Sequence, residues 1–237
     1  MNQLLVALDV DTVAEARALA AQLHGVAGGF KIGSRLFTAE GPGIVEDFAA
    51  RGERVFLDLK FHDIPNTVAG AVAVATRLGV WMLTVHASGG GAMLRAARDA
   101  AHQEAARAAR PAPLVIAVTM LTSLDQRALT EIGMAEGMTA QVGRLAALSE
   151  ASGLDGVVAS PHEIDIIRRR CARQFMIVTP GIRSATDVKG DQSRTMTAVE
   201  ALASGATYLV VGRPIIAASD PRAAAERIVS ECHDALT

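Results

Sequence analysis

Aromatic side chains and cysteines are scarce in this chain, and both shortages exclude classes of protein. The 237 residues include six phenylalanines, one tyrosine and one tryptophan, too few for the stacking platforms that bind single-stranded nucleic acid. The two cysteines, Cys171 and Cys232, are too few for a disulfide framework and lack the spacing of a metal site. We therefore expect reduced thiols in a cytoplasmic protein.

An excess of one charge and long hydrophobic runs are also missing. The chain has 23 basic and 25 acidic residues, a formal net charge of -2, which provides no basic surface for a polyanion. No run of 18 apolar residues occurs, and a strand-like segment at 4–8 follows the first residues without a basic leader. We expect no nucleic-acid partner, no membrane association and no export.

Short apolar segments alternate with longer amphipathic ones along the chain. Strands are predicted at 4–8, 29–32, 55–59, 81–85, 114–118, 156–159, 176–178 and 208–211. Helices are predicted at 12–23, 35–51, 64–78, 91–108, 139–152, 163–170, 195–203 and 221–234. Apolar strands separated by helices indicate an α/β protein with a parallel sheet, and eight such units predict a closed (β/α)8 TIM barrel. We expect a single domain over residues 1–237, with a doubly wound open sheet as the alternative.

Polar side chains gather where the predicted strands end, on the face of a barrel where active sites lie. They are Asp9, Lys31, Asp58, Lys60, His86, Thr119, Thr122, Ser160, Arg183 and Arg213, with Pro180 and Gly212 at the ends of the seventh and eighth strands. The third strand end is the most charged, and because side chains alternate along a strand, Asp58 and Lys60 point to the same face. Ionised groups at the end of a buried strand indicate a catalytic site, since burying an unpaired charge is costly.

The end of the eighth strand is typical of a phosphate site. Gly212 allows the backbone to approach a ligand closely, and Arg213 can bind two oxygens at once. The segment 181–194 is long and polar for a connection of this kind, and it predicts a lid over the phosphate. We therefore expect a phosphorylated small molecule as the ligand.

The segment 58–67, Asp-Leu-Lys-Phe-His-Asp-Ile-Pro-Asn-Thr, resembles the catalytic Asp-x-Lys-x-x-Asp-Ile motif of the orotidine 5'-monophosphate decarboxylase family. Further matches lie at 30–33, 85–90, 118–123, 179–183 and 190–192, so the resemblance runs from residue 5 to residue 215. It implies decarboxylation of the nucleotide orotidine 5'-monophosphate to uridine 5'-monophosphate in pyrimidine biosynthesis, with no cofactor and no metal.

The resemblance also implies roles for individual residues. Lys60 would protonate the ring carbon as carbon dioxide leaves, Asp58 would lie near the substrate carboxylate, and Lys31 would extend a chain of alternating charges. Asp63 and Thr67 would act in the site of the second subunit of a homodimer. The other residues implied to bind substrate are Asp9, Ile64, Thr122, Pro180, Arg183, Gln192, Gly212 and Arg213.

Two other functions remain open at this point. A magnesium-dependent phosphosugar decarboxylase or aldolase of the same superfamily shares the motif, but such enzymes have a metal-binding glutamate where this chain has Lys31. A lysine there would repel the metal ion. The second is a catalytically silent sensor of a phosphorylated ligand, which the intact set of Asp58, Lys60 and Asp63 disfavours.

Overall fold

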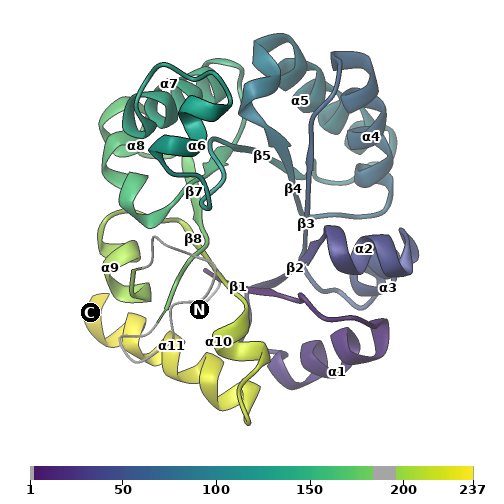
Figure 1. Cartoon of the computed structure of the whole chain (residues 1–237). Coiled ribbons are helices and arrows are strands. Elements are labelled where there is room, and N and C mark those ends of the chain that lie inside the picture. The colour runs from purple at the N-terminus through teal and green to yellow at the C-terminus, as the bar shows by residue number, and fades with distance from the viewer. Residues whose placement is uncertain (1–2, 184–195, 237) are drawn as a thin grey trace.

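Eight parallel strands form a closed barrel in the computed structural model of the chain (Figure 1). The structure describes residues 3–183 and 196–236, with side chains as far as residue 233. Each strand pairs with the next, and β8 pairs with β1 to close the ring. The strands are β1 (Leu4–Ala7), β2 (Gly29–Gly33), β3 (Val55–Phe61), β4 (Met82–His86), β5 (Leu114–Val118), β6 (Gly156–Val158), β7 (Met176–Thr179) and β8 (Tyr208–Val211). The predicted (β/α)8 barrel is confirmed, and the open sheet is wrong.

Helices surround the barrel (Figure 1). They are α1 (Val13–Leu23), α2 (Ser34–Glu40), α3 (Gly43–Ala50), α4 (Pro65–Arg77), α5 (Gly90–Arg107), α6 (Gln126–Glu131), α7 (Met138–Ala151), α8 (Ile164–Arg170), α9 (Ala198–Ala203), α10 (Arg213–Ile216) and α11 (Pro221–Leu236). Two short 3-10 turns, η1 (Ala87–Gly89) and η2 (Pro161–Glu163), precede α5 and α8. Across the described ranges, none of these helices has the length and apolar character needed to cross a membrane.

The predicted helix at 35–51 is wrong in one respect, because it is broken into α2 and α3. The backbone of Gly41 has φ of 70°, a left-handed conformation that glycine adopts at little cost. Its N–H donates to Phe37 O at 2.9 Å and ends α2. Pro42 has no N–H with which to continue the helix. The short helices α6 and α10 were not predicted, since neither is long enough to show a helical period.

Apolar side chains fill the inside of the barrel as well as the space between strands and helices. The inner cluster is formed by Leu5, Ala7, Phe56, Met82, Ile116, Val178 and Val210. Thr84 is an exception on β4, because it lies two residues beyond Met82, faces the same way and is fully buried. The barrel interior is therefore a packed apolar core in which the Thr84 hydroxyl is buried.

Aromatic side chains lie at the amino-terminal end of the barrel. The rings of Trp81 and Tyr208, which flank the starts of β4 and β8, meet edge to face with centroids 5.3 Å apart. The guanidinium carbon of Arg54 lies 5.3 Å from the centre of the Trp81 ring. Such contacts stabilise this end of the barrel.

Candidate active site

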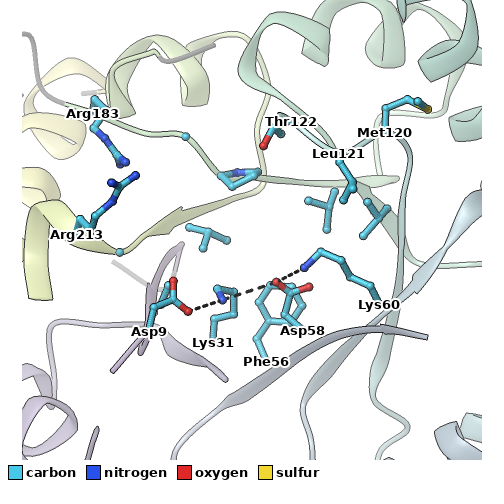
Figure 2. A pocket seen from close by; sticks show the side chains of 17 residues that line it. Asp9, Lys31, Phe56, Asp58, Lys60, Met120, Leu121, Thr122, Arg183 and Arg213 are labelled. Carbon is cyan, nitrogen blue, oxygen red and sulfur yellow. Dashed lines mark hydrogen bonds and ion pairs between the residues drawn. The ribbon is translucent and has the colours of Figure 1, made fainter. Parts of the chain in front are cut away.

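A pocket of about 260 Å³ opens at the carboxyl ends of the strands (Figure 2). Most residues selected from the sequence line it, although they come from all parts of the chain. They are Asp9, Lys31, Asp58, Lys60, Thr122, Pro180, Arg183, Gly212 and Arg213. The closed barrel thus brings together strand ends that are far apart in sequence.

Four charged side chains form a row of alternating sign along one side of the pocket (Figure 2). Lys31 Nζ lies 3.2 Å from Asp9 Oδ1 and 3.7 Å from Asp58 Oδ2. Lys60 Nζ donates to the same Asp58 oxygen at 2.9 Å. A Cβ atom at Gly33 would lie 3.0 Å from Lys31 Nζ, so glycine there leaves room for the ammonium group.

The carboxyl group of Asp58 is the centre of this row, and its side chain is only 13% exposed. Burial alone would raise its pKa, because a charged group loses solvation. The positive charges of Lys31 and Lys60, with hydrogen bonds from Lys60 and Thr84, outweigh burial and hold the pKa of Asp58 below its usual value. Asp58 is therefore a carboxylate at neutral pH.

The backbone of Lys60 is unusual, and regular strand alternation does not describe it. Its φ is 54°, in the left-handed region that non-glycine residues rarely adopt. Between the pairs Leu57–Leu83 and Phe61–Val85 the register shifts, so that four steps along β3 match two along β4. The predicted strand ended at residue 59, and this shift in register was not predicted. Asp58 and Lys60 both line the pocket, as predicted, and this irregularity, a bulge, lies at Lys60.

Arg183 and Arg213 lie at the other end of the pocket, with their guanidinium groups close to one another in Figure 2. Arg183 comes from the segment after β7 and donates to Ile182 O at 2.8 Å. The predicted phosphate ligand Gln192 lies outside the described residues, as does most of the predicted lid at 181–194. The pocket thus has an end with two arginines and an end with the Asp58–Lys60 pair.

His86, Thr119 and Ser160, at the ends of other strands, do not line the pocket. Three residues of the 58–67 motif also do not line the pocket of their own chain: Asp63, Ile64 and Thr67. All three are exposed, and Ile64 is 67% exposed. Asp63 Oδ1 accepts a hydrogen bond from the N–H of Ile64 at 2.6 Å. This group therefore lies on the surface at the start of α4.

The apolar wall of the pocket was missed from the sequence. It consists of Ala7, Phe56, Val118, Met120, Leu121, Val158 and Val210, beside Gly181. Strand alternation could have identified part of it, because Ala7, Phe56 and Val210 each lie two residues before a predicted site residue and face the same way. Within the described part of the chain, no cluster of three or more His, Cys, Asp or Glu side chains is arranged to hold a metal ion.

Comparisons with known proteins agree with this geometry. Residues 2–228 match the family model described as "Orotidine 5'-phosphate decarboxylase / HUMPS family". A protein of Moorella thermoacetica named orotidine 5'-phosphate decarboxylase is 56% identical over 97% of this chain and 92% of its own length. A namesake from Paramagnetospirillum magneticum is 50% identical over 98% of both chains.

Solved structures give the same result. The crystal structure of orotidine 5'-phosphate decarboxylase from Lactobacillus acidophilus superposes with a TM-score of 0.87 at 36% identity, covering 97% of this chain and 98% of the other. With the family model matching nearly the whole sequence, the chain belongs to the orotidine 5'-phosphate decarboxylase / HUMPS family.

Proposed function

We propose that this chain decarboxylates orotidine 5'-monophosphate to uridine 5'-monophosphate in pyrimidine biosynthesis, without a cofactor. Loss of carbon dioxide leaves an electron pair on a ring carbon, and nothing in the pyrimidine delocalises it well. A fixed cation and a proton donor near that carbon lower the barrier. Lys60 supplies both from a single ammonium group.

The observation that carries this proposal is the Lys31–Asp58–Lys60 row. Asp58 Oδ2 lies 2.9 Å from Lys60 Nζ and 3.7 Å from Lys31 Nζ, so the carboxylate stabilises the positive charge of both lysines. Lys60 then protonates the ring carbon as the carbon–carbon bond to the carboxylate breaks. Asp58 lies beside the substrate carboxylate and repels it until carbon dioxide leaves.

The rest of the substrate would span the pocket from this row to the arginines. We propose that Asp9 and Lys31 bind the ribose hydroxyls and that Thr122 hydrogen-bonds to the pyrimidine. The phosphate would lie against the residues at the far end, which are Pro180, Arg183, Gln192, Gly212 and Arg213. Binding energy from this remote group can be used to assemble the reactive arrangement at Lys60.

We further propose a homodimer in which Asp63, Ile64 and Thr67 complete the active site of the partner subunit. They are exposed in the single chain, outside its own pocket. Ile64 and Val74 near and on α4 are large apolar side chains that are 67% and 45% exposed. Such side chains favour burial in an interface. The proposal includes one domain over residues 1–237 and a cytoplasmic location, in line with the unpaired Cys171 and Cys232.

The decisive experiment is to follow the loss of orotidine 5'-monophosphate absorbance with the purified protein in a metal chelator. We expect full turnover, because the chemistry needs only side chains. Absence of turnover would refute the proposal. A requirement for added magnesium would favour the phosphosugar enzyme instead, although Lys31 Nζ lies between Asp9 and Asp58, where its charge would repel a metal ion.

Replacing Arg213 with alanine should lower kcat/KM for orotidine 5'-monophosphate by roughly 10- to 1000-fold, because one or two hydrogen bonds between ions are lost. Arg127, whose guanidinium pairs with Glu131 on the exposed helix α6, provides a matched control, and R127A should behave as the wild type. Orotidine, which has no phosphate, should be turned over equally slowly by R213A and the wild type. An equal loss on both substrates would contradict a phosphate role.

A further inference from the structure

Thr84 is a polar side chain in the interior of the barrel. It lies on β4, it is 0% exposed, and it is not among the residues that line the pocket. Its neighbours along the inward face, Met82 and Ile116, are apolar. Burying a hydroxyl among such groups is unfavourable unless it is hydrogen-bonded, so its partners indicate why it is there.

Both partners of Thr84 belong to the charged end of the pocket. The backbone N–H of Lys60 donates to Thr84 Oγ1 at 2.9 Å, and Thr84 Oγ1 donates to Asp58 Oδ1 at 3.0 Å. A single hydroxyl thus accepts one hydrogen bond and donates another. It connects the backbone of one charged residue to the side chain of the other.

The first of these bonds lies at the bulge in β3. There the register with β4 shifts, and Lys60 has φ of 54°. A conformation of this kind costs free energy and persists only where surrounding contacts hold it. Thr84 is directly across from the bulge, and its hydroxyl accepts the N–H of the residue in the strained conformation.

Because of the second bond, the two oxygens of the Asp58 carboxylate have different partners. Oδ2 faces the ammonium groups of Lys31 and Lys60, whereas Oδ1 accepts from Thr84. The hydrogen bond from Thr84 to Oδ1 fixes the orientation of the carboxylate. Hydrogen bonds to the charged form also favour that form.

We propose that Thr84 is a positioning residue of this active site, whose hydroxyl fixes both the Asp58 carboxylate and the backbone of Lys60. The consequence is that Lys60 Nζ is held where the ring carbon reacts, and this consequence rests on the proposed decarboxylation. Thr84 does not line the pocket. It acts through its hydrogen bonds to Asp58 and Lys60.

The test replaces Thr84 with valine, which keeps the shape and removes the hydroxyl. We expect kcat to fall about 10- to 100-fold, as for a lost hydrogen bond to a charged group. KM should change by less than about threefold, because the surfaces that bind substrate are intact. T84V removes a hydrogen bond to ionised Asp58, so the pKa of Asp58 should rise. The fall of kcat/KM at acidic pH should then begin at a higher pH, because Asp58 acts as a carboxylate.

Serine provides the matched control, because T84S restores the hydroxyl and should recover most of the lost kcat. If T84V does not fold, T84A and T84S form an equivalent pair, since both lack the methyl group and only serine has the oxygen. Thermal unfolding of each variant measures the structural effect separately. Equal kcat in T84A and T84S, or wild-type kcat in T84V, would overturn the inference.

A titration of the Asp58 carboxyl carbon by NMR separates this inference from the proposed function, because it needs no substrate. The pKa should be higher in T84V, or T84A, than in T84S and the wild type. An unchanged pKa would refute the role of Thr84 even if the wild type is a decarboxylase. If the wild type does not decarboxylate, the proposed function is wrong, and the titration still decides whether Thr84 holds Asp58.

Discussion

Replacement of Lys60 with alanine should lower kcat for orotidine 5'-monophosphate by roughly 10⁵-fold or more. A positioned general acid contributes about 10²–10⁴, and a preorganised group that stabilises developing charge contributes about 10²–10³. In the proposed mechanism Lys60 performs both tasks, and within the described residues Lys31 is the other lysine of the pocket, separated from Lys60 by Asp58. Single-turnover absorbance measurements with excess enzyme would quantify the remaining rate.

Binding of the product separates a chemical effect from a structural one. K60A should still bind uridine 5'-monophosphate when measured by calorimetry, because the arginines at the other end of the pocket are unchanged. Removal of the ammonium group also leaves a space at Asp58, so added primary amines should restore part of the rate. A loss of less than about 100-fold would exclude Lys60 as the proton donor.

Mixing K60A subunits with D63A subunits should restore activity that neither variant has alone. In a dimer with shared sites, each heterodimer has one site with both changes and one site with neither. Statistical exchange at equal concentrations makes half of the dimers mixed, so about a quarter of all sites are intact. Subunit exchange, or co-expression with two affinity tags, followed by the absorbance assay would measure the recovery.

A second mixture provides the control. Asp58 and Lys60 line the pocket of the same chain and are hydrogen-bonded to each other. Mixing K60A with D58A therefore leaves every site damaged and should restore nothing. If K60A and D63A also fail to complement while mixed dimers are present, Asp63 acts within its own chain and the shared site is wrong.

Much of the barrel was predictable because each strand is a short apolar run bounded by turns. The predicted strands agree with the structure to within two residues at either end. The polar residues beyond them, from Asp9 to Arg213, were predictable as a group because parallel strands bring their carboxyl ends to one face. The family resemblance implied the alternation of Lys31, Asp58 and Lys60, whereas the ion pair between Asp9 and Lys31 was not predicted.

What escaped prediction depends on contacts between segments. Thr84 lies within an apolar run, and only the pairing of β4 with the bulge in β3 reveals its bonds to Asp58 and Lys60. The bulge itself has no glycine to indicate it, because a lysine adopts the left-handed conformation. Gly41 and Pro42 did mark the break between α2 and α3, but the apolar periodicity on both sides concealed it.

The left-handed backbone at Lys60 has a consequence for the evolution of this site. Glycine would adopt φ of 54° without steric cost, and it is the residue that selection for folding alone would favour there. Glycine has no amine, so in the proposed mechanism its substitution for Lys60 would relieve the backbone and remove both the proton donor and the ion pair with Asp58. Position 60 is therefore a place where the backbone conformation and the proposed reaction have opposite preferences.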